Sequence, residues 1–195
     1  ISANGERMRM SIITNRTGQH NNKGFSLLEL LVVVAIMAVL TGIISITYRT
    51  VNKSNVNKAA SIVDDYLSLA REKAKTVSAY EWNMTISVGD DGTEVSYVKK
   101  AEKESDKAKM DSKTLPKNVK FKIIDDKGNE IRLDNTIKEV SVAFNSLTGN
   151  VSKVYFSNGS EIDVTDSSYC DFIAYYKEKS RGVRLYFVTG KHSQI

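Results

Sequence analysis

The sequence has few of the residues that cross-link a fold or build a catalytic or metal centre. It contains a single cysteine, Cys170, and two histidines, His20 and His192. One cysteine excludes an intramolecular disulfide. A zinc site, or a Cys–His or Ser–His catalytic pair, would have to use these few residues, and none of them lie near one another in the sequence. We therefore predict a protein that is not an enzyme and that holds no metal or other cofactor.

Proline is also nearly absent, since Pro116 is the only one. Turns in this chain must then rely on glycine, asparagine and aspartate. The formal net charge is +5, and much of it lies in the first 24 residues, which contain Arg7, Arg9, Arg16 and Lys23. The rest of the chain is only mildly basic, so its net charge alone does not indicate a nucleic-acid partner.

One long apolar run stands out against this background. Residues 25–46 hold a single charged side chain, Glu29, in 22 positions. As a helix the run would reach roughly 33 Å, which matches a hydrocarbon core of about 30 Å. It is too long for the apolar region of a secretory signal peptide and lacks the small-residue cleavage site of one. We predict a transmembrane helix half over residues 25–47. Because the basic residues precede it, the N-terminus should be cytoplasmic and the C-terminal domain extracytoplasmic.

The start of the apolar run carries a recognisable motif. Residues 22–29 read Asn-Lys-Gly-Phe-Ser-Leu-Leu-Glu, and they resemble the prepilin processing site of type IV pilins and type II secretion pseudopilins. In that family a basic leader ends in glycine, the mature chain begins with phenylalanine or methionine, and a glutamate follows four residues later. The resemblance implies a leader peptide over residues 1–24. It also implies cleavage between Gly24 and Phe25 by a membrane-embedded prepilin peptidase, followed by N-methylation of Phe25.

Glu29 is the second candidate residue of this motif. A carboxylate inside a bilayer costs a few kcal/mol unless it is paired, so an acid within a membrane segment is a functional candidate. The resemblance implies an assembly role, in which Glu29 pairs with the α-amine of Phe25 of a neighbouring subunit. An alternative is that Glu29 lies close enough to the helix start to reach the headgroups and to favour the positive end of its own helix.

Beyond the apolar run, hydrophobic residues recur first with a period of 3.6 residues and then at every second residue. The helical period predicts an amphipathic helix half over residues 48–78, with Val63, Tyr66 and Ala70 on its apolar face. Alternation begins after Glu81 and predicts β-strands, so residues 79–195 should form an extracytoplasmic β-rich globular domain. The fold class is then α+β and pilin-like, with one long N-terminal helix packed on an antiparallel β-sheet domain. Turns are expected at residues 90–92, 126–129, 148–150 and 158–159.

Two further features of this domain bear on function. Residues 101–117 are charged and nearly free of apolar side chains, so we expect a solvated loop, with a contact surface for DNA or another partner as the alternative. Residues 65–74, with shorter patches at 142–149 and 188–191, resemble elements of H-type minor pseudopilins and FimT-like pilins. The chain is thus similar to that group in its second half as well.

These features together predict a structural subunit, a pilin or minor pseudopilin, of a type IV pilus-like or type II secretion-type filament. The resemblance implies that its partners are other pilin or pseudopilin subunits, the prepilin peptidase, an assembly platform protein and membrane lipid. It also implies a location first in the cell membrane as a single-pass protein and then in a filament at the cell surface or envelope. A filament-tip binding module for DNA or a secreted substrate is the alternative, and a membrane-anchored enzyme is less favoured.

Overall fold

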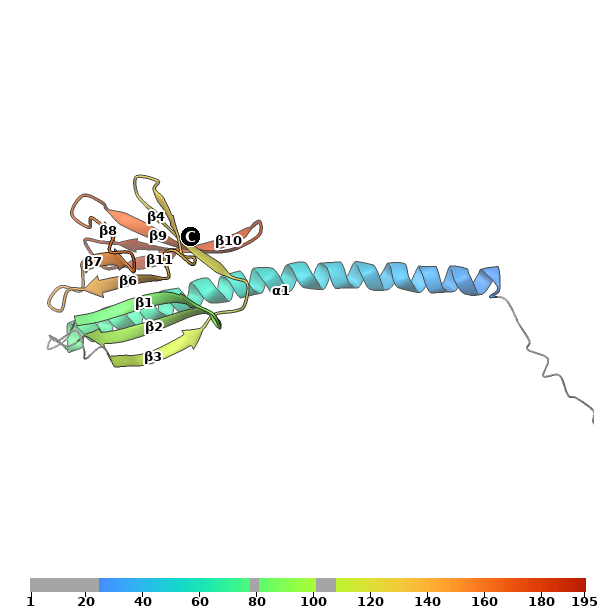
Figure 1. Cartoon of the computed structure of the whole chain (residues 1–195), viewed down its shortest axis with the longest axis horizontal. Coiled ribbons are helices and arrows are strands. Elements are labelled where there is room, and N and C mark those ends of the chain that lie inside the picture. Colours follow the sequence, from blue (N-terminus) through green and yellow to red (C-terminus); the bar gives the residue numbers. More distant parts are fainter. Residues whose placement is uncertain (1–24, 78–80, 101–107) are drawn as a thin grey trace, which may run out of the picture. The chain divides into compact units, whose positions relative to one another are not determined.

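The computed structural model describes residues 25–77, 81–100 and 108–195, and the chain forms two compact units, residues 1–43 and residues 44–195. The predicted leader over residues 1–24 lies outside the described residues. Helix α1, Leu27–Thr76, contributes to both units (Figure 1). It contains no proline, and its only glycine is Gly42. The predicted helix of residues 25–78 therefore forms with ends close to those expected.

The first unit contains the N-terminal part of α1. Among the helical residues that the structure describes, none belongs to a stretch long and apolar enough to cross a membrane. The predicted transmembrane half over residues 25–47 is therefore not confirmed.

The second unit contains the remainder of α1, which buries one face. The buried side chains recur every three or four residues, as the sequence period predicts. Tyr66 is only 7% exposed, so the expectation that the Val63, Tyr66 and Ala70 face is covered is confirmed. The buried residues of this face include Val56, Ala59, Ala60, Val63, Tyr66, Leu67, Ala70 and Ala74.

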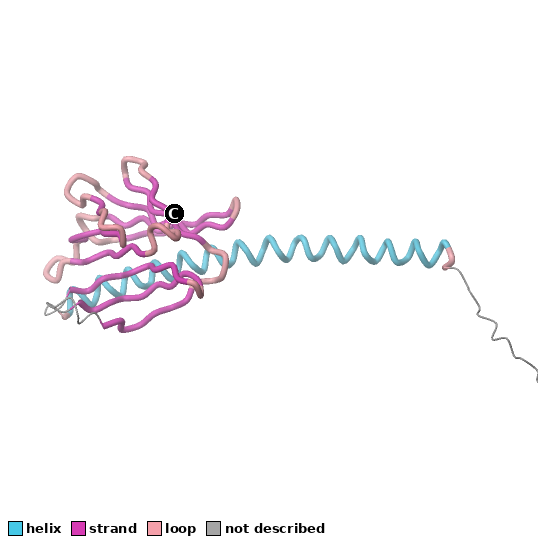
Figure 2. Tube along the Cα trace, in the orientation of Figure 1, coloured by secondary structure: helices cyan, strands magenta, loops and turns pink. Residues whose placement is uncertain are grey.

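Two antiparallel sheets make up the rest of this unit (Figures 1 and 2). The larger sheet has the strand order β3-β2-β1-β6-β7-β8. The bounds of its strands are β1 Glu81–Gly89, β2 Gly92–Lys100, β3 Ala108–Thr114, β6 Glu139–Phe144, β7 Val151–Phe156 and β8 Glu161–Ile162. The smaller sheet has the order β11-β10-β9-β4-β5. Its strands are β4 Lys120–Asp125, β5 Glu130–Arg132, β9 Tyr169–Tyr176, β10 Lys179–Tyr186 and β11 His192–Gln194.

One hydrophobic core joins α1 to both sheets. Its largest fully buried side chains come from α1 and from strands of each sheet, and they include Leu67, Met84, Ile86, Phe121, Phe172 and Leu185. Burial of such side chains is the main favourable term in folding. The predicted α+β class, with an N-terminal helix packed on antiparallel sheet, is confirmed.

The turns follow the predicted chemistry. Gly89 pairs with Gly92 across the hairpin of β1 and β2, so residues 90–91 form a two-residue turn. Gly128, Gly149 and Gly159, in the other predicted turns, have φ values of +85°, +71° and +82°. Glycine populates this left-handed region without the steric cost that a Cβ atom imposes.

The prediction of a loop over residues 101–117 is wrong for residues 108–114. Residues 101–107 lie outside the described residues, but Ala108–Thr114 form strand β3, which pairs with β2 from Glu94↔Thr114 to Lys99↔Ala108. β3 lies at the edge of its sheet, where lysines and other polar residues are common because one side of the strand stays unpaired. The sequence lacks an apolar alternation there for that reason. Among residues 110–117, whose burial the structure describes, Leu115, beyond the strand, is the one buried in the core.

Candidate processing and assembly site

The start of α1 is organised by Ser26. The backbone N–H of Glu29 donates a hydrogen bond of 3.1 Å to Ser26 Oγ, and the N–H of Leu30 donates one of 3.1 Å to the Ser26 carbonyl oxygen. Ser26 is therefore the N-cap residue, and Glu29 occupies the third helical position. A serine at the cap and a glutamate three residues later are the residue types of a capping box. The helix thus begins at Leu27, directly after the Ser26 cap, because of residues that are adjacent in the sequence.

Two of the three predicted site residues flank this cap. Phe25 lies immediately before it and is 85% exposed, and Glu29 is exposed in the first turn. Four residues separate them, which corresponds to about 6 Å along a helix axis. Gly24 lies outside the described residues. Phe25 thus lies at an exposed helix end.

The Glu29 side chain is exposed in the first turn of α1. Within the described parts of the chain, no hydrogen bond or ion pair engages this side chain, although its backbone N–H is bonded to Ser26. A carboxylate near a helix N-terminus interacts favourably with the partial positive charge there.

Around and after Glu29 the helix surface is apolar on every side. All of its large hydrophobic side chains up to Ile43 are at least 46% exposed within the chain. A helix that is apolar all round is stable in water only when another apolar phase covers it. The exposed side chains are Phe25, Leu27, Leu28, Leu30, Leu31, Val32, Val33, Val34, Ile36, Met37, Val39, Leu40 and Ile43.

The structure also brings together residues that the sequence kept apart. His192 Nε2 lies 2.9 Å from Ser68 Oγ and 3.4 Å from Asp64 Oδ1. A catalytic serine–histidine–aspartate arrangement needs the hydroxyl on one ring nitrogen and the carboxylate on the other. Here both groups contact Nε2, and Nδ1 is buried without a hydrogen-bond partner among the described residues. Sequence reasoning missed this cluster because 124 positions separate Ser68 from His192. These contacts join β11 to α1, and they do not activate Ser68 as a nucleophile.

Cys170 is a core residue of β9. It is fully buried, and burial, followed by the nearby carboxylates of Asp171, Asp125 and Asp126, raises the pKa of its thiol well above the ordinary value. A thiol held in the protonated form is a poor nucleophile and a poor metal ligand. Over the described ranges, no group of three histidine, cysteine, aspartate or glutamate side chains is arranged to hold a metal ion.

The three patches that resemble H-type and FimT-like pilins meet at Arg71. Arg71 Nε donates a hydrogen bond of 3.1 Å to the Gly149 carbonyl oxygen, and a terminal guanidinium nitrogen donates one of 3.0 Å to the Thr189 carbonyl oxygen. Each of these residues belongs to a different patch. The contact holds two β-turns against the end of α1, so the patches share a structural role.

Comparison with protein families places a known signal on the site just described. A family model for the prokaryotic N-terminal methylation motif matches residues 19–45, which include Gly24, Phe25 and Glu29. Searches of curated proteins and of solved structures found no match. The match does not extend to the second half of the chain, so the H-type or FimT-like subtype is not confirmed. The chain carries a type IV pilin-like prepilin signal at its capped helix start.

Proposed function

We propose that this protein is a structural subunit of a type IV pilus-like or type II secretion-type filament, cleaved after Gly24 and N-methylated on Phe25. One observation carries the proposal: the methylation motif at residues 19–45 coincides with the exposed start of α1, where Ser26 caps the helix. The motif supports a filament subunit in preference to an enzyme.

Cleavage would create the group to which, in this proposal, Glu29 of a neighbouring subunit binds. Hydrolysis before Phe25 leaves an α-amine with an ordinary pKa of about 8, and an N-methylated amine is still protonated at neutral pH. This cation would lie at the positive end of its own helix, where the backbone gives it no compensation. The exposed Glu29 carboxylate of a neighbouring subunit can compensate it. Such pairing fixes the axial register of adjacent helices. Phe25 of one subunit would lie level with Glu29 of its neighbour, so the two helices would be offset by about one turn.

The apolar surface of α1 gives the assembly its driving force. Its side chains are exposed in the isolated chain, so they require lipid or other helices around them. The proposal is a membrane-anchored precursor with a cytoplasmic N-terminus, whose apolar helix later joins a bundle of identical or related helices. The prepilin peptidase, an assembly platform protein and other subunits would act on it in turn. The proposal includes three segment boundaries. The leader ends at residue 24, the transmembrane helix half at residue 47 and the amphipathic helix half at residue 78.

The processing step is tested by co-expression with a prepilin peptidase and intact mass spectrometry. We expect the mass of residues 25–195 plus one methyl group. A peptidase with an inactivated active site and a Gly24→Val variant are the matched controls, and both should leave the precursor mass unchanged. Cleavage beyond the apolar run, or an intact precursor beside an active peptidase, would contradict the proposal.

A further inference from the structure

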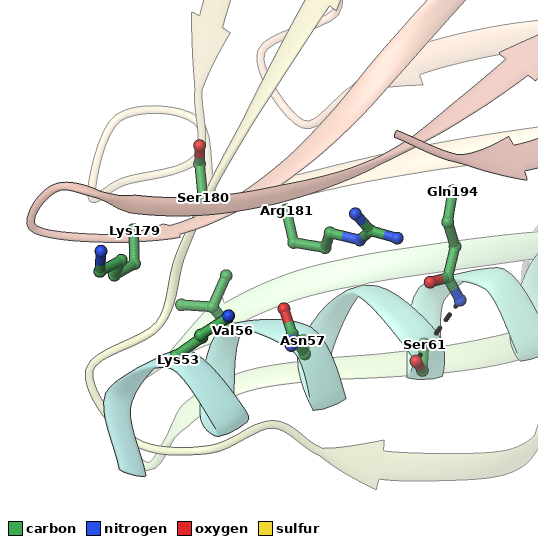
Figure 3. A pocket seen from close by; sticks show the side chains of 8 residues that line it. All are labelled: Lys53, Val56, Asn57, Ser61, Lys179, Ser180, Arg181 and Gln194. Atoms are coloured by element: carbon green, nitrogen blue, oxygen red, sulfur yellow. Dashed lines mark hydrogen bonds between the residues drawn. The ribbon is translucent and has the colours of Figure 1, made fainter. Parts of the chain in front are cut away.

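A hollow lies between α1 and the smaller sheet, and all of its lining residues belong to the second unit (Figure 3). It has a volume of about 560 Å³. Lys53 and Asn57 line it from the helix, and Lys179 and Arg181 line it from β10. Figure 3 shows Arg181 extending along the space between the strand and the helix. Ligand pockets in proteins measure roughly 300–1,000 Å³, so this hollow is large enough to be a binding site.

The lining of this hollow, here called the cationic hollow, carries positive charge without negative charge. Its charged residues are Lys53, Lys179 and Arg181, and all three are exposed. None of them forms an ion pair with a carboxylate that the structure describes, whereas Lys122 of the same sheet lies 2.6 Å from Glu130. The cationic hollow therefore has the charge of a site for an anion.

The acids close to the hollow do not pair with its cations. Asp64 accepts a hydrogen bond of 3.3 Å from Gln194 and lies 3.4 Å from His192. Glu178 precedes Lys179 in the turn between β9 and β10 and is not among the lining residues. The charges of the lining are thus left for an anion from outside the hollow.

The second unit also presents two adjacent carboxylates on a narrow projection. Residues 89–92, here called the acidic tip, read Gly-Asp-Asp-Gly and form the turn between β1 and β2. The neighbouring strands end before this turn, since β6 pairs with β1 as far as Ser87 and β3 pairs with β2 from Glu94 onward. A Cβ atom built at Gly89 or Gly92 would meet no atom outside the turn within 4 Å. The acidic tip is therefore slender and open on its flanks.

Both carboxylates of the acidic tip lack a partner within the described ranges. Asp90 and Asp91 are exposed, and no hydrogen bond or ion pair engages either side chain there. Two adjacent negative charges repel each other, and a cationic partner relieves that repulsion. The acidic tip is not part of the lining of the cationic hollow of its own chain. The two surfaces are complementary in charge, and one chain does not satisfy them.

We propose that the acidic tip of one subunit inserts into the cationic hollow of a second copy of this chain. Arginine binds a carboxylate through two parallel hydrogen bonds, and lysine pairs with one as a point charge. A single ion pair at a surface contributes little to binding, but a network of several charges contributes more. Here two carboxylates would meet three cations inside a hollow.

This contact is head-to-tail, because the tip and the hollow are different surfaces. Each copy gives its tip to one neighbour and accepts the tip of another. Contacts of this kind produce closed rings or open helical filaments. The choice of a second copy as the occupant rests on the proposed function, in which subunits repeat along a filament. The inference adds a pair of surfaces on the globular units that would hold neighbouring subunits together.

The contact is tested by carbodiimide cross-linking of the full chain in neutral detergent micelles. This reagent joins a carboxylate directly to a lysine amine, so it captures groups that touch. An isotopically light chain with Lys53→Gln and Lys179→Gln keeps its tip, and a heavy chain with Asp90→Asn and Asp91→Asn keeps its hollow. After mixing, we expect a peptide in which the light tip is joined to Lys53 or Lys179 of the heavy chain. Such a link can form only between two molecules.

The third cation provides a variant that leaves the cross-linking groups in place. Arg181→Glu in the heavy chain should lower the yield of this link at least about tenfold, because like charges that face each other across an interface are strongly unfavourable. Lys191→Glu makes the same change of charge at an exposed position between β10 and β11, and it should leave the yield unchanged. Circular dichroism checks that each variant folds.

An exchange of charges gives an independent test. Asp90→Lys and Asp91→Lys reverse the tip of one chain, and Lys53→Glu, Lys179→Glu and Arg181→Glu reverse the hollow of the other. We expect the link to form again, now from a tip amine to a hollow carboxylate. Neither tip aspartate has a positive φ, so lysine fits the turn without backbone strain.

Three results would overturn the inference. These are the absence of the light–heavy link, a yield unaffected by Arg181→Glu, or binding of inorganic phosphate in the hollow by a chain that forms no link. The assay needs neither peptidase nor filament, so a missing link leaves the proposed filament role standing. Failure of processing, in turn, leaves the contact between two copies standing.

Discussion

The backbone N–H of Glu29 donates a hydrogen bond to Ser26 Oγ at 3.1 Å. The residue proposed to pair with a neighbouring subunit therefore also takes part in starting its own helix. The two roles use different atoms, since the cap needs only the Glu29 backbone and the pairing needs only its carboxylate. Substitutions at Ser26 and at Glu29 can consequently separate helix formation from assembly.

Replacing Ser26 with alanine should loosen the first turn of α1. Loss of an N-cap side chain costs about 1 kcal/mol of helix stability, and the Glu29 N–H loses its acceptor. We expect faster amide exchange at Glu29, measured by NMR on the full chain in detergent micelles. Ser26→Asp, which keeps a side-chain acceptor at the cap, is the control and should exchange slowly. Equal exchange in Ser26→Ala and the unmodified chain would contradict the capping role.

Replacing Gly190 with alanine should strongly destabilise the second unit. Gly190 has a φ of +62°, and a Cβ atom there would lie 1.9 Å from the Gly149 carbonyl oxygen, which accepts a hydrogen bond from Arg71. Backbone must move to relieve that contact, so we expect a loss of at least about 3 kcal/mol in the free energy of unfolding.

Gly159→Ala is the matched control for this substitution. Gly159 has a φ of +82°, but a Cβ atom there meets nothing within 4 Å. Only the left-handed backbone conformation is then penalised, by roughly 1–2 kcal/mol. Denaturant unfolding followed by circular dichroism compares the two variants. A Gly190→Ala variant as stable as Gly159→Ala would show that the two turns do not pack as closely as described.

Two turn aspartates should make the domain less stable in acid. The side-chain and backbone hydrogen bonds from Thr165 lower the pKa of Asp163, and the backbone N–H groups of Thr136 and Ile137 lower the pKa of Asp134. A lowered folded pKa means that the stabilisation is complete above the unfolded pKa of about 4 and is lost as the pH falls through the folded value.

The double variant Asp163→Asn and Asp134→Asn keeps an oxygen acceptor at each turn and removes the titration. We expect the unmodified chain to lose more stability than this variant between pH 5 and pH 2, as measured by urea unfolding at each pH. Parallel pH profiles would mean that the hydrogen bonds of these two turns do not stabilise the charged carboxylates.

The start of α1 and the β1–β2 hairpin could be predicted because their signals are local. The apolar run, the change of period after Glu81 and the glycine at position 92 each act over a few residues. Strand β3 could not be predicted in the same way. Its lysines follow from its place at a sheet edge, and that place is set by pairing with β2, which no local pattern encodes.

Contacts between distant segments were beyond sequence reasoning for a similar reason. Arg71 lies on the predicted amphipathic helix, but its acceptors Gly149 and Thr189 are backbone carbonyls, which any residue type can supply. Lys53 of α1 and Arg181 of β10 line one hollow, although more than a hundred positions separate them. Their residue types are common on any surface, so only the fold brings them together.

The pairing of Glu29 with the Phe25 amine of a neighbouring subunit is the central step proposed for assembly. Glu29→Gln keeps the size of the side chain and the backbone cap but removes the charge, and Glu29→Leu also removes its polarity. Without the carboxylate, the Phe25 amine of the next subunit would enter an apolar helix bundle as an unpaired cation, which is costly. Processing should proceed, because the peptide bond before Phe25 is unchanged.

The most direct measurement is the ratio of this protein in sheared filaments to that in the membrane fraction of the native host. Glu72→Gln, at an exposed position of the same helix, is the matched control and should leave the ratio unchanged. For Glu29→Gln and Glu29→Leu we predict normal cleavage after Gly24 and normal membrane levels, with a ratio at least about tenfold below that of the unmodified chain, as expected for an uncompensated buried charge. A ratio equal to that of the unmodified chain would contradict the assembly role of Glu29.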